Sequence, residues 1–246
     1  MSVSQFKSFM DCEARTMAEL NEEWTRCEST ALLVGSYTHT AFDSEEASQA
    51  FLEANKKAIF TSNGKKKRSD FEMADAMIQT IKEDPLSMLV MEGKKEVIVT
   101  AELFGTTWKA KLDVLNHEKK RIGDLKTTQD LQKRYWSNKY GGWVSFIQAY
   151  DYVLQMAMYK AIVECNFEGD YKPYIVAVTK QTPPDKAVIQ FSQDWFDAEY
   201  SFMEEELPHV LQVKRGEIPP KRCEKCEYCR SNKKLMDAVD LEDLLG

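Results

Sequence analysis

Two short segments with strand-like alternation, joined by a polar turn, constrain the fold more than any other part of the chain. The segments are residues 109–116 and 121–127, and the turn is the His-Glu-Lys-Lys sequence of residues 117–120. Alternating side chains on both sides of a polar turn predict two neighbouring strands of one sheet. Because side chains on a strand alternate between its faces, we expect Asp124 and Lys126 to share one face.

The acidic residues of these strands suit a metal site. If Asp113 faces the same way as Asp124, two carboxylates and the amine of Lys126 meet at one point. The carbonyl of Leu125 would lie near them, and Gly123 allows a close approach of the backbone. Oxygen ligands of this kind bind Mg²⁺ or Mn²⁺, which also take up phosphate oxygens of a substrate. Lys126 would orient or deprotonate the attacking water and stabilise the developing charge. The alternative is a solvated strand surface with an ion pair that contributes little stability.

The spacing of these residues resembles a known nuclease signature. Asp113, ten intervening residues and then Asp124-Leu-Lys126 are similar to the motif of PD-(D/E)xK nucleases, and more closely to that of their RecB-like and phage RecE- and lambda-type exonuclease branch. The resemblance implies an α/β fold with a central mixed β-sheet flanked by helices. It also implies that Asp113, Asp124 and the Leu125 carbonyl hold the metal and that Lys126 is catalytic.

A histidine upstream extends the resemblance. Gly35-x-x-x-His39 is similar to an element of RecB-like nucleases in which the histidine adds a nitrogen ligand to the metal. Manganese tolerates such a nitrogen better than magnesium does. The alternative is that His39 is a packed or helix-capping residue.

A polar stripe marks the long helix that we expect over residues 144–165. Four residues recur on one helix face at alternating spacings of four and three: Gln148, Tyr152, Gln155 and Tyr159. The run from Gln155 to Tyr159 resembles the Gln-x-x-x-Tyr element of RecB-like nucleases, whose helix flanks the metal site. These amides could bind the catalytic carboxylates or the DNA backbone, and Thr127 could support the same surface. The alternative is an amphipathic core helix with polar edges.

A third acidic residue, Glu102, lies on the hairpin that we expect from residues 96–104 and 107–114. The face of Glu102 depends on the register, because a slip of one residue moves every side chain to the other side. If Phe104 pairs with Trp108, Glu102 points away from Asp113. If Phe104 pairs with Lys109, the two acids face alike, and the sequence leaves this choice open.

The remaining pattern predicts further helices and strands around this sheet. We expect a first helix over residues 4–26 that begins at a Ser4 cap, and a helical region over residues 43–84 that a basic turn at 62–68 interrupts. Two more strands are expected at residues 174–179 and 187–191. A helix over residues 195–215 should have a kink or break at Pro208, and a short terminal helix should cover residues 235–245.

Three cysteines crowd into the C-terminal segment as Cys223-x-x-Cys226-x-x-Cys229. Three thiolates are one ligand short of a complete metal site, and we expect Cys12, or otherwise Cys27, to supply the fourth. Iron-sulfur RecB-like nucleases are similar in joining one N-terminal cysteine to three C-terminal ones, although their C-terminal spacing is wider. The resemblance implies a [4Fe-4S] cluster, Zn²⁺ is an alternative, and a tail of reduced thiols is another.

The cysteine spacing also sets the expected domain organisation. We predict a nuclease domain over residues 1–220 and a Cys-rich segment over residues 221–246 that packs back on the N-terminal helix.

Composition limits the cellular context and the partners. The chain has 246 residues, 43% hydrophobic and 30% charged, enough for one large domain. No run approaches the ~20 apolar residues of a membrane helix and no signal peptide is evident, so we expect a cytoplasmic protein without a membrane partner. The net charge of −7 does not favour nucleic-acid binding. Local basic segments at residues 65–68, 119–121 and 133–134 could still contact a phosphate backbone.

The resemblance implies that the chain degrades one strand of linear duplex DNA from an end during phage-type recombination. A single-strand annealing protein would receive the exposed strand, and a homo-oligomeric ring would provide processivity. One alternative is an iron-sulfur nuclease specific for single-stranded DNA. The other is a non-catalytic DNA-end binding protein of the same fold, which the intact Asp113, Asp124 and Lys126 argue against.

Overall fold

The computed structural model describes residues 1–26, 29–62, 64–234, 238 and 241. The chain forms two compact units, one made of residues 1–3 and 27–205 and the other of residues 4–26 and 206–246. We call these the sheet unit and the cysteine unit. The division differs from the predicted boundary after residue 220, because the N-terminal helices and the last part of a long helix join the Cys-rich segment.

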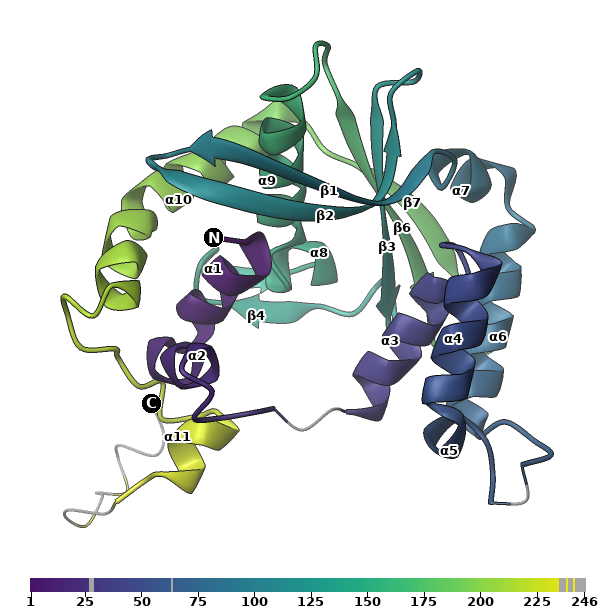
Figure 1. Ribbon diagram of the computed structural model, residues 1–246, viewed down its shortest axis with the longest axis horizontal. Helices are drawn as coiled ribbons and strands as arrows, with labels where there is room; N and C mark the ends of the chain where they lie inside the picture. Colours follow the sequence, from purple (N-terminus) through teal and green to yellow (C-terminus); the bar gives the residue numbers. More distant parts are fainter. Residues whose placement is uncertain (27–28, 63, 235–237, 239–240, 242–246) are drawn as a thin grey trace. The chain divides into compact units, whose positions relative to one another are not determined.

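A five-stranded mixed sheet is the centre of the sheet unit (Figure 1). The strand order is β1-β2-β3-β6-β7, and all neighbours are antiparallel except β3 and β6, which are parallel. The bounds are β1 (Lys94–Leu103), β2 (Thr106–Asn116), β3 (Arg121–Thr128), β6 (Lys172–Thr179) and β7 (Lys186–Gln190). The predicted central mixed sheet is therefore confirmed, including the pair of strands on either side of the polar turn.

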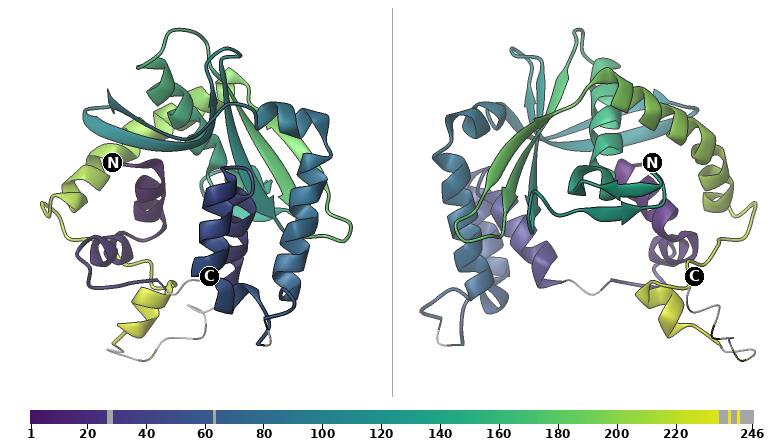
Figure 2. Two further views of the ribbon diagram at one scale, coloured as in Figure 1. Left: turned by 45° about the vertical axis from the view of Figure 1, so that its right-hand side comes forward. Right: turned by 180° about the vertical axis from the view of Figure 1, so that it is seen from behind.

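Helices cover both faces of this sheet. Successive side chains of β6 point alternately into the two hydrophobic cores on either side. Val176 and Val178 face one core together with Leu125 of β3, while Ile175 and Ala177 face the other. The first core is covered by α3 (Thr30–Thr40), α4 (Glu45–Ala54), α5 (Lys56–Ile59), α6 (Ser69–Lys82) and α7 (Pro85–Val90). Figure 2 shows α3, α4 and α6 side by side. The second core is covered by α8 (Phe146–Ala149), α9 (Tyr152–Glu164) and the start of α10 (Gln193–Lys214). A strand that is buried on both faces accounts for the continuous apolar run of β6.

The predicted single helix over residues 144–165 is wrong, because the chain breaks between α8 and α9. Asp151 has a φ of 50° at this break, a left-handed conformation that a helix cannot contain. Gln148 therefore belongs to α8, where it forms a capping box with Ser145. A small hairpin of β4 (Tyr135–Ser137) and β5 (Gly142–Val144) precedes the break and was not predicted.

The cysteine unit joins both ends of the chain. Its helices are α1 (Val3–Asp11, from Ser4 onward), α2 (Glu13–Leu20), the end of α10 and α11 (Glu227–Ser231). Glu13 accepts hydrogen bonds at 2.8 Å from His209 Nε2 and from the backbone N–H of Lys221. Long-range bonds of this kind hold the N-terminal helices against the C-terminal segment.

Three helix predictions need correction or lie outside the described residues. The first helix starts at Val3 rather than after a Ser4 cap, and the extended backbone of Cys12 (φ −168°) divides it into α1 and α2. The helix α10 continues through Pro208, so the predicted break is absent, while a kink at this residue stays a prediction. The predicted terminal helix over residues 235–245 falls almost wholly outside the described residues. Among the described helices, none combines the length and apolar character needed to cross a membrane.

Candidate active site

The site lies where β2 and β3 separate. The two strands pair only between Val114–Asn116 and Arg121–Gly123, after which β3 continues to pair with β6 alone. At the separation, Asp113 Oδ2 accepts a hydrogen bond of 2.9 Å from the N–H of Leu125. The N–H and C=O of one residue in a strand point to the same side, so the Leu125 carbonyl also faces the Asp113 side.

Asp124 and Lys126 meet on one face of β3, as the alternation predicts. Lys126 Nζ lies 2.5 Å from Asp124 Oδ2, and Asp124 is 1% exposed. Gln155 of α9 donates to Asp124 Oδ1 at 2.9 Å and also to the hydroxyl of Tyr159 at 3.2 Å. Of the pair from the Gln-x-x-x-Tyr element, Gln155 therefore contacts Asp124 directly and Tyr159 contacts Gln155.

His39 reaches the same point from α3. Its Nδ1 lies 3.2 Å from Asp113 Oδ2, so the imidazole and the carboxylate can interact directly. Gly35, one turn earlier on α3, lies beside β3, because an added Cβ would make an ordinary van der Waals contact of 3.9 Å with Thr127 Oγ1. The structure thus brings together Asp113, Asp124, Lys126 and His39, while their catalytic roles stay predictions.

The pKa values of the two carboxylates are shifted in opposite directions. Burial raises the pKa of Asp124 to about 6, and the charge of Asp113 adds to this effect while Lys126 opposes it. Burial also acts to raise the pKa of Asp113, but the hydrogen bond and charge of His39 and the charge of Lys126 outweigh it, so its pKa is lowered. The pKa of Lys126 is raised because both aspartates outweigh the effect of burial. These charges favour the ammonium form of Lys126, which suits charge stabilisation.

The chemical types of these donors suit a divalent metal ion. Asp124 Oδ2 is buried and makes no hydrogen bond besides its ion pair with Lys126. Two carboxylates, one strand carbonyl and one imidazole nitrogen make a mainly oxygen-based set, which suits Mg²⁺ or Mn²⁺.

A cavity of about 810 Å³ opens onto these residues within the sheet unit. Its lining includes His39, Asp113, Lys126 and Thr127, so these side chains border open space, whereas the buried Asp124 is not part of the lining. Two further cations, Lys111 and Lys180, and three tyrosines (Tyr135, Tyr150 and Tyr152) also line it. A cavity that combines acids, cations and aromatic rings can hold a phosphate backbone together with its bases.

Glu96 is a cavity acid that the sequence analysis missed. It belongs to β1, lines the cavity and pairs with Lys111, and its neighbours in β1 pair with those of Asp113 in β2. The strand register could have indicated this position had the turn been known. Its φ of 54° marks an irregular point in the strand.

Glu102 is not part of this site. It pairs with Thr107 next to the two-residue turn formed by Phe104 and Gly105, so neither register considered from the sequence is the observed one. Its side chain accepts a hydrogen bond from the Thr107 hydroxyl, and it is absent from the cavity lining.

Two side chains of the basic turn at residues 65–68 make contacts within the protein. Lys67 donates to the Tyr37 hydroxyl and pairs with Asp75 at 2.6 Å. Arg68 donates to the backbone carbonyl of Phe60. This part of the expected DNA-contacting surface therefore has structural partners of its own.

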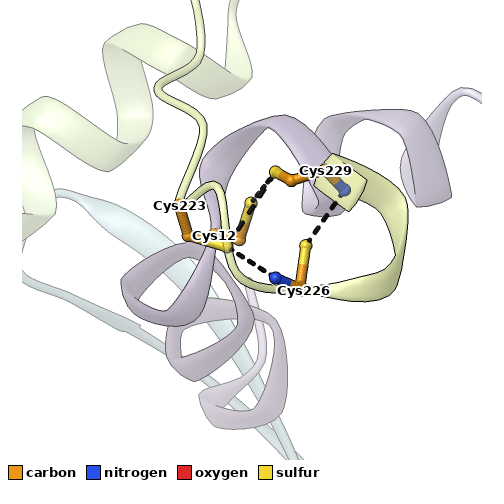
Figure 3. Close-up of side chains that lie close together, drawn as sticks. All are labelled: Cys12, Cys223, Cys226 and Cys229. Carbon is orange, nitrogen blue, oxygen red and sulfur yellow. Dashed lines mark hydrogen bonds between the residues drawn. The ribbon is translucent and has the colours of Figure 1, made fainter. Parts of the chain in front are cut away.

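A second donor set occurs in the cysteine unit, where four cysteines converge (Figure 3). The sulfur atoms of Cys12, Cys223, Cys226 and Cys229 all lie within 4.8 Å of one another. Burial acts to raise the pKa of Cys223, but backbone N–H bonds from Lys225 and Cys226 outweigh it and lower this pKa to about 6. Burial raises the pKa of Cys12 to about 12. The predicted grouping of Cys12 with the three C-terminal cysteines is present, and the alternative ligand Cys27 lies outside the described residues.

Comparison with known proteins identifies the family. Residues 2–232 match the family described as PDDEXK-like domain of unknown function (DUF3799), and the chain belongs to this family. A crystal structure described as a "putative exonuclease" from Eubacterium rectale is 35% identical, with a TM-score of 0.91, and the match covers 99% of this chain and 92% of that one. No curated protein matches the chain. The predicted PD-(D/E)xK relationship and fold are thus confirmed, and both findings agree with a nuclease.

Proposed function

We propose that the protein is a metal-dependent deoxyribonuclease that acts as an exonuclease on DNA ends. The observation that carries this proposal is the convergence of Asp113, Asp124 and Lys126 at the separation of β2 and β3, where Asp113 and Lys126 line a cavity. The family match and the similarity to a protein described as an exonuclease support the same reaction class.

The residues divide the work of phosphodiester hydrolysis. Asp113, Asp124 and the Leu125 carbonyl would hold Mg²⁺ or Mn²⁺, and His39 would add a nitrogen ligand. When bound, such an ion supplies a water of lowered pKa and screens charge on the phosphate. Lys126 orients the attacking water and stabilises the negative charge that develops on the phosphate oxygens. Gln155 fixes Asp124 in place through its 2.9 Å hydrogen bond.

Binding of the substrate rests on local charge, since the net charge of the chain is −7. Lys111 and Lys180 lie in the cavity lining, and the hydroxyl of Thr127 lies beside the metal ligands in sequence. Contacts to phosphates position a nucleic acid without reading its sequence. We therefore expect hydrolysis to depend little on base sequence.

The resemblance to phage exonucleases extends this proposal to a cellular role. In that role the enzyme resects linear duplex DNA for recombination in the cytoplasm, passes the exposed strand to an annealing protein and works as a homo-oligomeric ring. These points rest on the resemblance, whereas the hydrolytic site rests on named contacts.

Digestion of end-labelled linear duplex tests the activity. Substrates labelled at the 5′ or the 3′ end are incubated with the protein and Mg²⁺, Mn²⁺ or a chelator, beside a closed circular duplex. We expect release of nucleotides from the linear substrate with either metal, and none from the circle or with chelator. Absence of nucleotide release from linear DNA under all metal conditions would contradict the proposed function.

A further inference from the structure

Three tyrosines form a continuous wall of the cavity, beginning at Lys126. Lys126 Nζ lies 4.8 Å from the ring centroid of Tyr152. The ring of Tyr152 is 5.9 Å from that of Tyr150, which is 5.4 Å from that of Tyr135. All three rings belong to the cavity lining. The wall thus leads from the proposed reaction centre along the cavity.

Tyr150 is the member of this wall that packing explains least. It is 48% exposed, although a ring of this size contributes much stability when it is buried. Tyr135 and Tyr152 pack against the core beside α8 and α9, whereas Tyr150 is not among the residues of that core. A half-exposed ring that faces a cavity is available to a ligand.

The break between α8 and α9 sets the position of Tyr150. Asp151 follows it in a left-handed conformation (φ 50°) that costs free energy for a residue with a side chain. Lys139 Nζ pairs with Asp151 at 2.9 Å and with Glu199 at 2.5 Å, which holds the break. Strained backbone that is held by ion pairs from other parts of the chain is typical of a functional position.

We propose that Tyr152, Tyr150 and Tyr135 stack the unpaired bases of the DNA strand that is cut, so that the strand enters the cavity single-stranded. This inference rests on the proposed nuclease function. Aromatic rings stack with any base because every base has a π-face, and this contact does not depend on sequence. In a duplex those faces are covered by neighbouring base pairs, so only a separated or single strand can use the wall.

Binding of fluorescent oligonucleotides in the presence of chelator tests the wall without cleavage. We expect Tyr150→Ala to weaken binding of single-stranded DNA by at least about five-fold, and Tyr150→Phe to retain it because the ring remains. Phe167→Ala is the matched control, since Phe167 is also partly exposed but lies outside the cavity lining. With metal present, Tyr150→Ala should raise KM and leave kcat nearly unchanged.

The outcomes separate this inference from the nuclease proposal. Equal affinity of Tyr150→Ala and Phe167→Ala for single-stranded DNA would overturn the proposal that the tyrosines stack bases, even if the wild-type protein cleaves DNA. Equal effects of Tyr150→Ala on single-strand and blunt-duplex affinity would overturn it as well. Loss of single-strand affinity in Tyr150→Ala, with no cleavage by the wild type, would leave the wall standing and remove the nuclease proposal.

A second inference concerns the ion held by the four cysteines and rests on their spacing. Cys229 Sγ lies 3.6 Å from Cys12 Sγ and 3.9 Å from Cys223 Sγ. Four thiolates at about 2.3 Å around one tetrahedral zinc ion would lie about 3.8 Å apart. In a [4Fe-4S] cluster each thiolate binds a different iron atom, so the sulfurs must enclose the whole inorganic core. The observed spacing, with all sulfurs within 4.8 Å, leaves no room for that core.

The surrounding backbone is arranged for thiolates. Cys223 Sγ accepts backbone N–H bonds from Cys226 at 3.3 Å and from Lys225 at 3.5 Å. The N–H of Cys229 donates to Cys226 Sγ at 3.4 Å, and that of Arg15 donates to Cys12 Sγ at 3.5 Å. Figure 3 shows the four side chains pointing toward one another. The geometry points to a single tetrahedral Zn²⁺ held by Cys12, Cys223, Cys226 and Cys229, in place of the iron-sulfur cluster that the resemblance implies.

Metal analysis of the full-length protein, purified without oxygen, tests this assignment. We expect one equivalent of zinc per chain, no acid-labile sulfide and no visible absorption. Cys229→Ser should lose the zinc, whereas Cys165→Ser should keep it, because Cys165 is exposed and outside the cluster. Iron with matching sulfide, or zinc that remains bound in Cys229→Ser, would overturn the assignment.

Discussion

The sheet unit and the cysteine unit each gather metal-binding side chains, but with opposite chemistry. Asp113 and His39 offer oxygen and nitrogen donors that line a cavity, and the buried Asp124 offers a second carboxylate. The cysteine unit offers four sulfur donors that surround one point. Catalytic metal sites keep a position open for water or substrate, whereas structural zinc sites are closed by four protein ligands.

The difference shows how each unit reaches its geometry. In the sheet unit, the separation of two strands frees the Leu125 N–H for Asp113, and a neighbouring lysine balances the charge. In the cysteine unit, short helix caps aim backbone N–H groups at sulfur. We infer that the first region performs the reaction and that the second holds the chain ends together.

Replacement of Lys126 should have the largest effect of these variants. This effect should be confined to the site formed by Asp113, Asp124, Lys126 and His39, which we call the oxygen site. We expect Lys126→Ala to lower the rate of DNA hydrolysis by roughly 10²–10³-fold, because it removes stabilisation of transition-state charge. Metal content at the cysteines should not change. The rate is measured by nucleotide release, and folding by circular dichroism.

Lys94→Ala is the control for that variant, because Lys94 is exposed, lies outside the cavity lining and belongs to none of the basic segments expected to contact DNA. It should retain nearly full activity. A Lys126→Ala enzyme as active as this control would refute the role assigned to Lys126.

The central sheet and the meeting of Asp124 with Lys126 could be predicted because they depend on local alternation. A strand fixes the face of every second side chain, whatever it packs against. The parallel partner of β3 could not be read in this way, since it depends on a crossover through α9. The contact between Gln155 and Asp124 was anticipated only through the family resemblance.

The break at Asp151 and the position of Glu96 could not be predicted, because distant residues determine both. Asp151 is held by Lys139, which is itself paired with Glu199 some 48 positions after the break. Glu96 reaches the cavity through the register of β1 on β2, which the turn at Phe104 and Gly105 sets. A sequence pattern records neither constraint.

Gly123→Ala should produce the next largest effect, by disturbing the place where the strands separate. An added Cβ would lie 2.7 Å from the backbone oxygen of Val90, so β3 or α7 must move. We expect a loss of about 2–3 kcal/mol in the free energy of unfolding. Urea denaturation measures this loss. Gly142→Ala is the control, since nothing lies within 4 Å of its added Cβ, and similar losses in both variants would contradict the explanation.

Gln155→Leu should have a smaller effect on stability, because it removes the hydrogen bonds to Asp124 and Tyr159 but nearly keeps the side-chain volume. Asp124 Oδ1 would lose its donor while remaining buried, which costs about 1–3 kcal/mol. Hydrolysis should also slow, since the carboxylate that we propose as a metal ligand is no longer held. Gln79→Leu provides the comparison, because Gln79 is exposed and its side chain donates a hydrogen bond to the exposed Glu83. Equal denaturation curves for the two variants would show that the bond to Asp124 contributes nothing.

Glu13→Gln should give the smallest effect and should affect the cysteine unit alone. The amide oxygen can still accept from the Lys221 N–H, but the charge that faces His209 is removed. We expect a loss of about 1 kcal/mol in local stability, seen as faster hydrogen exchange in α2 and the segment after α10. DNA hydrolysis should stay at the wild-type rate, because no residue of the oxygen site contacts Glu13 in the described hydrogen bonds and ion pairs. A matching loss of hydrolysis would mean that the two units are energetically coupled and that the division of labour between oxygen and sulfur donors is incomplete.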